Sequence, residues 1–367
     1  MPRSMPSTMP AEAADRADER RNPLEVLGPG LVTGAADDDP SGIGTYSQVG
    51  AQFGYSLAWA MLFGFPLLAS IQAICARIGA TTGRGIAHNL RRHYNPWLLR
   101  FVVLLLLVAN VINLGADLGA MAAALDLLMP GPVVLYTIVF ALVSIAAEVF
   151  LPYERYAGIL KWTTLSLFSY IAVLFATDVP WGEVARGVLV PQFTFDREHA
   201  MGLVALFGTT ISPYLFFWQA GQEVEEQRRR HTKPLHVAPR AAGPELKRIR
   251  TDTLVGMGFS NITAQAIVIA TAATLHAHGI TEVATANEAA SALRPLAGDF
   301  AFALFAIGII GTGLLAVPVL AGSAAYAISE ALHVAEGLDR RPREAKAFYA
   351  AIALATLAGL AINFLPI

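Results

Sequence analysis

Apolar stretches of about 20 residues recur along the whole chain, and a stretch of that length can cross a bilayer. Nine of them cover residues 29–52, 55–79, 98–121, 132–151, 156–177, 200–226, 253–277, 299–330 and 346–365. Only 15% of the residues are charged, whereas a soluble domain carries about 25%. Since a backbone in lipid must satisfy its own hydrogen bonds, such stretches fold as helices. The sequence therefore predicts an all-α polytopic membrane protein, with a transmembrane domain at residues 27–367 and a disordered cytoplasmic tail at residues 1–26.

The distribution of Lys and Arg predicts the orientation of these spans. With the N-terminus placed in the cytoplasm, 23 of the 26 Lys and Arg residues fall on the inner side. Only Arg186, Arg197 and Arg294 fall on the outer side. An excess of this kind is typical of cytoplasmic loops. We therefore expect a multi-pass protein of the cell membrane with a cytoplasmic N-terminus.

The first and the sixth apolar stretches are interrupted by polar residues and proline. In the first, Asp37, Asp38 and Asp39 precede Pro40. Proline suits the first turn of a new helix and aspartate suits its cap. In the sixth, Pro213 follows Ser212. A proline inside a helix lacks an N–H and frees carbonyls about one turn earlier, here those around Thr209 and Thr210.

The two interruptions occupy matching places in two halves of the chain. Pro40 and Pro213 are 173 residues apart, with five spans from one break to the next. This spacing matches an inverted repeat of five helices plus five, whose broken helices form a transporter's central site. A carboxylate inside the membrane is by default a functional residue, so we assign such a role to Asp39. Asp37 and Asp38 either line the way in or are simply solvated.

The groups offered by the two breaks are hard oxygen donors. They comprise the Asp39 carboxylate, the Ser212 hydroxyl and several backbone carbonyls, and neither break contains Cys, Met or His. Oxygen ligands suit Mg²⁺, Ca²⁺ and Mn²⁺. We therefore expect a divalent cation as the substrate rather than as a cofactor, and we expect no cofactor.

The segment DPSGIGTYSQVGAQFGY resembles the first-helix motif of the NRAMP family of divalent metal transporters. Asp39 and Pro40 match that motif, whereas Ser41 and Gly42 stand where the family has Gly and a ligating Asn. In the sixth span Ser212 and Tyr214 replace the family's Met and His; the segments SNITAQAIVIATA and LFAIGIIGTGLLAVPVLAGSAAY are also similar to the family. The resemblance implies a LeuT-type fold with broken helices 1 and 6. That fold has ten core helices and this chain ends after nine spans, so we expect a C-terminally truncated version.

The resemblance also implies a set of site residues. The metal would be held by Asp39, by the carbonyls of Ala36 and Thr209, and by Ser212. The candidate ion pathway comprises Asp37, Asp38, Gly42, Thr210, Tyr214, Asp117, Asn261 and Glu223. Because it lacks this Met and this Asn, the chain resembles the NRAMP-related branch described as magnesium transporters. We therefore expect uptake of Mg²⁺, with Mn²⁺ as the second candidate, by alternating access, and we expect no protein partner and no nucleic acid.

Proton coupling is not carried over by the resemblance. The family's proton-linked His is Tyr214 here, and the first residue of its acidic pair in span three aligns with Leu114, which leaves only Asp117. Two individual residues also have structural alternatives. Glu223 either lines the ion's exit or belongs to a solvated helix end, and Asn261 either gates the pathway or makes an interhelical hydrogen bond.

Two other functions are compatible with the same residues. A LeuT-type transporter of a small organic solute such as an amino acid would use the dipole of a broken helix, but three aspartates would repel the solute's carboxylate. An intramembrane hydrolase would need two carboxylates facing each other from different helices, for which Asp39 and Asp117 are candidates. The leading prediction is a metal transporter that is not an enzyme.

Overall fold

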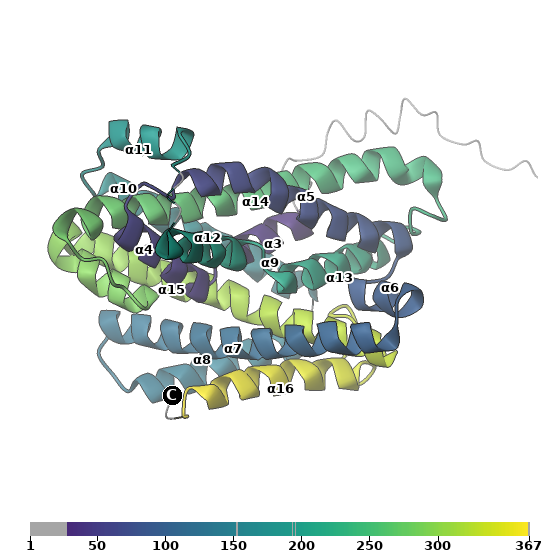
Figure 1. Cartoon of the computed structure of the whole chain (residues 1–367). Coiled ribbons are helices and arrows are strands. Elements are labelled where there is room, and N and C mark those ends of the chain that lie inside the picture. The colour runs from purple at the N-terminus through teal and green to yellow at the C-terminus, as the bar shows by residue number, and fades with distance from the viewer. Residues whose placement is uncertain (1–27, 152, 193, 195, 366–367) are drawn as a thin grey trace, which may run out of the picture.

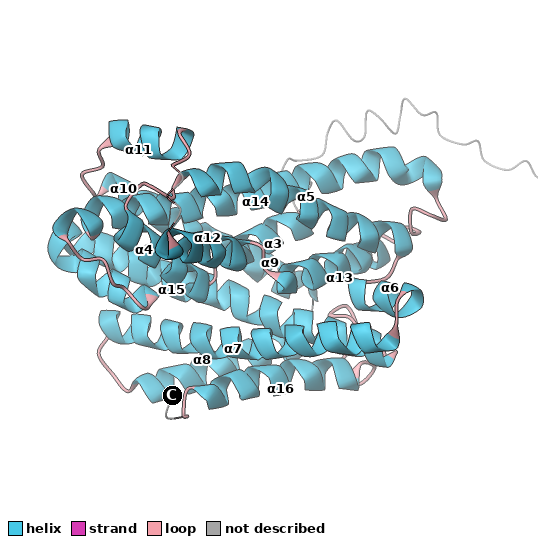
Figure 2. Cartoon of the chain, in the orientation of Figure 1, coloured by secondary structure: helices cyan, strands magenta, loops and turns pink. Residues whose placement is uncertain are grey.

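The structure is a computed structural model that describes residues 28–365 except residues 152, 193 and 195. This described part is helical, without strands (Figure 2). Seven of its helical segments are long and apolar enough to cross a membrane. The prediction of an all-α polytopic membrane protein is therefore confirmed. The predicted tail, residues 1–26, lies outside the described residues.

The helices follow the predicted spans closely (Figure 1). Their bounds are α3 Pro29–Asp37, α4 Pro40–Phe53, α5 Trp59–Thr82, α6 Ile86–His93, α7 Pro96–Leu128, α8 Val133–Phe150, α9 Tyr153–Thr163, η1 Thr164–Ser166, α10 Leu167–Phe175, α11 Trp181–Leu189, α12 Arg197–Thr210, α13 Pro213–Arg229, η2 Pro239–Ala241, α14 Ala242–Thr274, η3 His276–His278, α15 Ala286–Leu332 and α16 Lys346–Ile362. The helices α3, α4, α7 and α13 begin with proline in the first turn, where its missing N–H is not needed.

Two pairs of short helices form the two broken spans. The first pair is α3 and α4, and the second is α12 and α13. The helix α3 packs against α13, and α4 packs against α12, so the two broken spans run antiparallel (Figure 1). Each half of one broken span therefore lies beside the opposite half of the other, as an inverted repeat requires.

Glycine allows α3 to approach α14 with backbone against backbone. A Cβ atom built on Gly256 would lie 2.0 Å from the carbonyl oxygen of Gly30, and one on Gly34 would lie 2.1 Å from the Gly256 carbonyl carbon. No side chain fits at those distances. Small residues spaced four apart, such as Gly30 and Gly34, commonly bring membrane helices this close. The contact fixes α3, and therefore the first break, against α14.

The longest helix, α15, packs along α7 and brings the second half of the chain onto the first. It is broken at Gly298, whose φ of 85° lies in the region that favours glycine. The helices α7, α8 and α16 lie together along one side of the bundle (Figure 1). Large apolar side chains on α7 and α8, including Phe101, Leu105 and Leu142, are more than half exposed, which is the pattern of surfaces that face lipid.

The two ends of the bundle differ in charge. The connectors 84–95, 230–241 and 333–345 lie at one end, and we call this end the basic end because these three segments contain nine of the Arg and Lys residues. The opposite end, which we call the open end, contains the end of α4, the beginning of α12 and the segment 281–285 before α15. The two helix breaks lie between these ends.

Candidate metal site between the two helix breaks

The first break is held open by Asp39. The helix α3 ends at Asp37, and α4 begins at Pro40, with Asp39 in an extended conformation between them. One oxygen of the Asp39 carboxylate accepts hydrogen bonds from the Gly42 N–H at 2.6 Å and from the Ser41 hydroxyl at 2.9 Å. The predicted cap is therefore confirmed. The positive end of the α4 dipole stabilises the carboxylate in this place.

The second break separates α12 from α13 at Ile211 and Ser212. Since Pro213 has no N–H, the helix cannot continue its hydrogen bonds here. The Ser212 hydroxyl instead donates to the Thr209 carbonyl at 2.6 Å, and the Thr210 hydroxyl donates to the Leu206 carbonyl. The break therefore places a backbone carbonyl and a hydroxyl oxygen side by side.

The two breaks meet in the middle of the bundle. The Tyr214 hydroxyl, in the first turn of α13, donates to the carbonyl of Ala36 in α3 at 2.7 Å. A Cβ atom on Gly42 would lie 3.0 Å from an Asp39 carboxylate oxygen and 3.2 Å from the Thr209 hydroxyl. Asp39, Ala36, Thr209 and Ser212, the four predicted ligand residues, are therefore gathered at two facing breaks.

Three more carboxylates are buried around the same place. Asp37, Asp38 and Asp117 are each at most 1% exposed. Asp37 accepts a hydrogen bond from the Ser260 hydroxyl at 3.1 Å, and Asp117 accepts one from the Ser41 N–H at 3.1 Å. Both carboxylate oxygens of Asp38 lack a hydrogen-bond partner within the described residues. The alternative that Asp37 and Asp38 are simply solvated is therefore wrong.

Within the described residues, no Lys or Arg forms an ion pair with these four aspartates. Buried carboxylates without such partners need a cation or protons to balance their charge. The same part of the chain contains no group of three or more His, Cys, Asp or Glu side chains that could hold a metal ion. An ion bound here would therefore take backbone carbonyls and water among its ligands.

A cavity of about 860 Å³ reaches this region from the open end. It is lined by α4 from Ser41 to Phe53, by the first half of α12 and by residues 282–284. Ser41 is the residue whose hydroxyl and N–H contact Asp39 and Asp117. A helix of 14 residues is about 21 Å long, so the cavity follows nearly the whole length of α4 down to the acidic residues.

Charged residues close the path toward the basic end. The Asp252 carboxylate accepts hydrogen bonds from the N–H groups of Gly28, Gly30 and Leu31 at 2.9, 2.8 and 3.2 Å. It therefore caps the first turn of α3. Arg248 lies 3.7 Å from Asp252 and forms a buried ion pair with Glu223 of α13. Sequence reasoning missed Arg248 and Asp252, although charges four residues apart before an apolar stretch were a usable signal.

Two residues of the candidate pathway lie away from the breaks. Glu223 is fully buried in its ion pair with Arg248, so the alternative of a solvated helix end is wrong. The Asn261 side-chain amide donates to the Met61 carbonyl of α5 at 3.0 Å. This is the interhelical hydrogen bond that one of the two alternatives for Asn261 predicts.

Comparison with known proteins gives the family. The family model described as "Natural resistance-associated macrophage protein-like" (Nramp) matches residues 30–367. This chain belongs to the Nramp family. The Nramp resemblance found around Asp39 and Pro40 is therefore confirmed, and it extends over nearly the whole chain.

Curated relatives in the Nramp family are named as divalent metal cation transporters. A protein of this name from Verminephrobacter eiseniae is 30% identical over 297 residues, which is 79% of this chain and 65% of that protein. One from Acidiphilium cryptum is 28% identical over 82% of this chain and 69% of that protein. The chain thus spans about two thirds of the length of these relatives. These relatives are named as transporters rather than as enzymes.

Solved structures confirm the LeuT-type fold. A manganese transporter of Eremococcus coleocola superposes with a TM-score of 0.71 at 17% identity, and the match covers 92% of this chain and 69% of that chain. The nucleobase-cation-symport-1 family transporter Mhp1 superposes with a TM-score of 0.61 at 14% identity, over 92% of this chain and 71% of that chain.

Proposed function

We propose that this Nramp protein transports divalent metal cations across the cell membrane, binding them between the two helix breaks. The observation that carries the proposal is the meeting of these breaks at the Tyr214–Ala36 hydrogen bond, beside Asp39 and three further buried carboxylates. Asp39, the carbonyls of Ala36 and Thr209, and Ser212 would hold the ion. The names of the Nramp relatives support the same activity.

We propose Mg²⁺ as the preferred ion and Mn²⁺ as the second. The proposed ligands are all oxygen atoms, which Mg²⁺ favours. Gly42 lies so close to Asp39 and Thr209 that an added Cβ atom would lie 3.0 and 3.2 Å from their side-chain oxygens, so this position contributes no side-chain ligand. Because Mg²⁺ gives up its water reluctantly, a site with few protein ligands suits a partly hydrated ion.

The ion would move by alternating access. In this structure the cavity along α4 leads to Ser41 from the open end, and Asp252 and Arg248 close the opposite side. With the N-terminus in the cytoplasm, the basic end is cytoplasmic, as the excess of Lys and Arg favours. Ions would then bind from outside, pass Asp37, Asp38 and Asp117, and leave once α3 separates from Asp252.

The two other functions receive less support. An amino acid would bring its carboxylate against Asp37, Asp38 and Asp39, all of which are buried at the first break. A hydrolase would need Asp39 and Asp117 close together, and Ser41 does connect them through two hydrogen bonds. The Nramp relatives, however, are named as transporters.

Uptake into proteoliposomes tests the proposal. We expect the purified protein to admit Mg²⁺, and we expect Asp39→Asn to abolish this uptake, because the amide keeps a cap oxygen for α4 but loses the charge. Asp126→Asn is the matched control, because Asp126 accepts a hydrogen bond from the Gly131 N–H beyond the end of α7, and it should transport normally.

Calorimetry with Mg²⁺, Mn²⁺ and Ca²⁺ on the same variants gives the selectivity. Binding of Mn²⁺ without Mg²⁺ would contradict the magnesium assignment but leave the site intact. Undiminished uptake by Asp39→Asn would contradict the site itself.

A further inference from the structure

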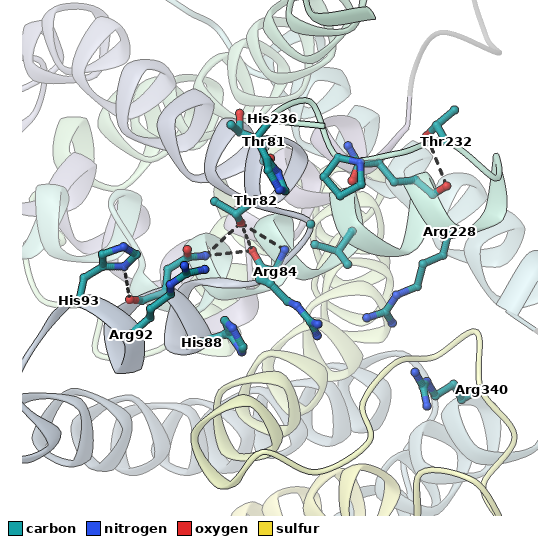
Figure 3. A pocket seen from close by; sticks show the side chains of 15 residues that line it. Thr81, Thr82, Arg84, His88, Arg92, His93, Arg228, Thr232, His236 and Arg340 are labelled. Atoms are coloured by element: carbon teal, nitrogen blue, oxygen red, sulfur yellow. Dashed lines mark hydrogen bonds between the residues drawn. The ribbon is translucent and has the colours of Figure 1, made fainter. Parts of the chain in front are cut away.

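A second large cavity opens at the basic end, away from the helix breaks (Figure 3). Its volume is about 870 Å³, within the range of about 300–1,000 Å³ that is usual for small-molecule sites. The end of α5, the helix α6, the end of α13, the connector 230–241 and Arg340 form its walls. We call it the basic cavity.

The lining of the basic cavity is strongly cationic. Four arginines line it, namely Arg84, Arg92, Arg228 and Arg340, together with three histidines, and no Asp or Glu is among its lining residues. Figure 3 shows the side chains of Arg84 and Arg228 extending toward each other. Such a concentration of like charge in a concave site attracts anions.

Three of the four arginines have no direct ion pair, although Glu336, outside the lining, interacts electrostatically with Arg228, Arg84 and Arg340. Arg84, Arg92 and Arg340 form no ion pair with any residue that the structure describes. Arg228 lies 4.0 Å from Glu336 and 3.8 Å from Asp339, which are long contacts, and neither acid lines the cavity.

The pKa of His88 reflects the same surroundings. Burial lowers the pKa of this lining residue, and the charges of Arg84, Arg91 and Arg92 lower it further. The basic cavity is thus a place where one more positive charge is disfavoured.

The wall of the basic cavity is held by specific backbone contacts. At the end of α5, Gly83 has a φ of 65° and packs so closely on Pro234 that a Cβ atom would lie 2.4 Å from the proline ring. The N–H groups of Leu235 and His236 then donate to the carbonyls of Ala80 and Thr81 at 3.1 and 3.2 Å. The connector after α13 therefore completes the hydrogen bonding at the end of α5.

A second set of contacts fixes the turn that carries Arg84. The Asn89 side-chain amide donates to the carbonyls of Arg84 and Gly85 and to the Thr82 hydroxyl, at 3.2, 2.8 and 3.1 Å. The Arg84 N–H also donates to the Thr82 hydroxyl at 3.2 Å. The backbone of Arg84 is therefore positioned before any ligand arrives, which limits the ordering cost of binding.

We propose that the basic cavity binds a ligand that carries at least two phosphate groups. The planar guanidinium of arginine matches phosphate oxygens with paired hydrogen bonds, and several arginines from separate segments suit more than one phosphate. Two sources present this chemistry at the end of a membrane protein: a soluble polyphosphate and the headgroup of an anionic diphosphate lipid. The site is distinct from the proposed metal site, so its test does not depend on transport.

Binding to the purified full-length protein in detergent tests the proposal. Inorganic triphosphate titrated in a calorimeter is the soluble probe, and cardiolipin retained in native mass spectrometry, against phosphatidylcholine, is the lipid probe. We expect at least one probe to bind the wild type and to bind the double variant Arg84→Gln/Arg340→Gln at least tenfold more weakly. Arg240→Gln/Arg250→Gln is the matched control, because it removes two exposed arginines that do not line the cavity.

Each outcome decides the question. Triphosphate binding that is lost only in the cavity variant supports a soluble ligand, and cardiolipin retention that is lost only there supports a lipid headgroup. If neither probe binds the wild type, or if both double variants weaken binding equally, the proposal is wrong. Should the cavity double variant melt well below the wild type, the single variant Arg92→Gln, on the exposed face of α6, replaces it with the same expected direction.

Discussion

At the scale of single residues, the site depends on a few polar atoms that satisfy groups freed by proline. Asp39 caps α4, Ser212 covers the Thr209 carbonyl, and Tyr214 covers the Ala36 carbonyl. Each of these atoms has a structural task, and those of Asp39 and Ser212 would also serve the ion under the proposed function. The breaks are thus held in shape before an ion arrives, which reduces the cost of binding it.

The Tyr214 hydroxyl gives a test of this preorganisation. Tyr214→Phe leaves the buried Ala36 carbonyl without its donor, which costs about 1–3 kcal/mol. We therefore expect a lower melting temperature and weaker Mg²⁺ binding by calorimetry. Tyr136→Phe is the control, because it removes a hydroxyl that donates to the Met129 carbonyl at an exposed position, and it should change neither quantity. Equal behaviour of the two variants would show that the Tyr214–Ala36 bond does not support the site.

At the scale of helices, the position of the first break is set by α14. Gly256 meets the backbone of α3, and Asp252 caps its first turn. These contacts were not predictable from the sequence, because Asp252 and Gly28 are 224 residues apart. In addition, α14 begins at Ala242, well before the apolar stretch at 253–277 from which the span was predicted. The breaks themselves were predictable, because proline and aspartate act on their own neighbours.

Two glycines of α14, two residues apart and therefore on nearly opposite faces of the helix, test the close contact with α3. In Gly256→Ala the new Cβ atom meets the Gly30 carbonyl at 2.0 Å, and overpacking of this kind costs about 1–3 kcal/mol or more. In Gly258→Ala the new Cβ atom lies 3.7 Å from the Phe65 ring, and the better helix propensity of alanine contributes up to about 1 kcal/mol. Thermal melting in detergent should therefore fall for the first variant and hold or rise for the second. The reverse order would contradict the packing described here.

The carboxylate of Asp252 gives a test of the cap on α3. Asp252→Ala removes the acceptor of three N–H groups, so the first turn of α3 should open more often. Hydrogen exchange of the amides at residues 28–34 should become at least tenfold faster, with α16 unchanged. Asp299→Ala serves as control, because the Asp299–Arg294 pair is exposed and far along the chain. Unchanged exchange at residues 28–34 would mean that other contacts hold this end.

At the scale of the whole molecule, charge separates the two ends of the bundle. The open end has a cavity that leads to the helix breaks, and the basic end has the Asp252 cap and the basic cavity. The spans were predicted from the hydropathy along the sequence, and the difference in charge between the two ends was predicted from the positions of Lys and Arg. The cavities could not be predicted from these sequence features, because a cavity depends on the distances between helices that are far apart in the sequence.

Labelling from one side of the membrane tests the orientation. In a Cys75→Ala background, Lys233→Cys lies in the connector at the basic end, and Glu282→Cys lies beside the cavity at the open end. With a cytoplasmic N-terminus, an impermeant maleimide should label Glu282→Cys in intact cells and Lys233→Cys only after lysis. Labelling in the opposite order would reverse the orientation and, with it, the direction assigned to the ion.

The cavity along α4 has an electrical consequence. Water in a wide passage conducts, so the solution at the open end would extend electrically down to Ser41. The transmembrane voltage would then fall across the layer between Ser41 and Asp252. That voltage is worth about 2.3 kcal/mol per elementary charge at 100 mV. In the proposed transporter, an ion arriving through the cavity crosses little of this field before it binds, so release toward the basic end is the step that the voltage drives.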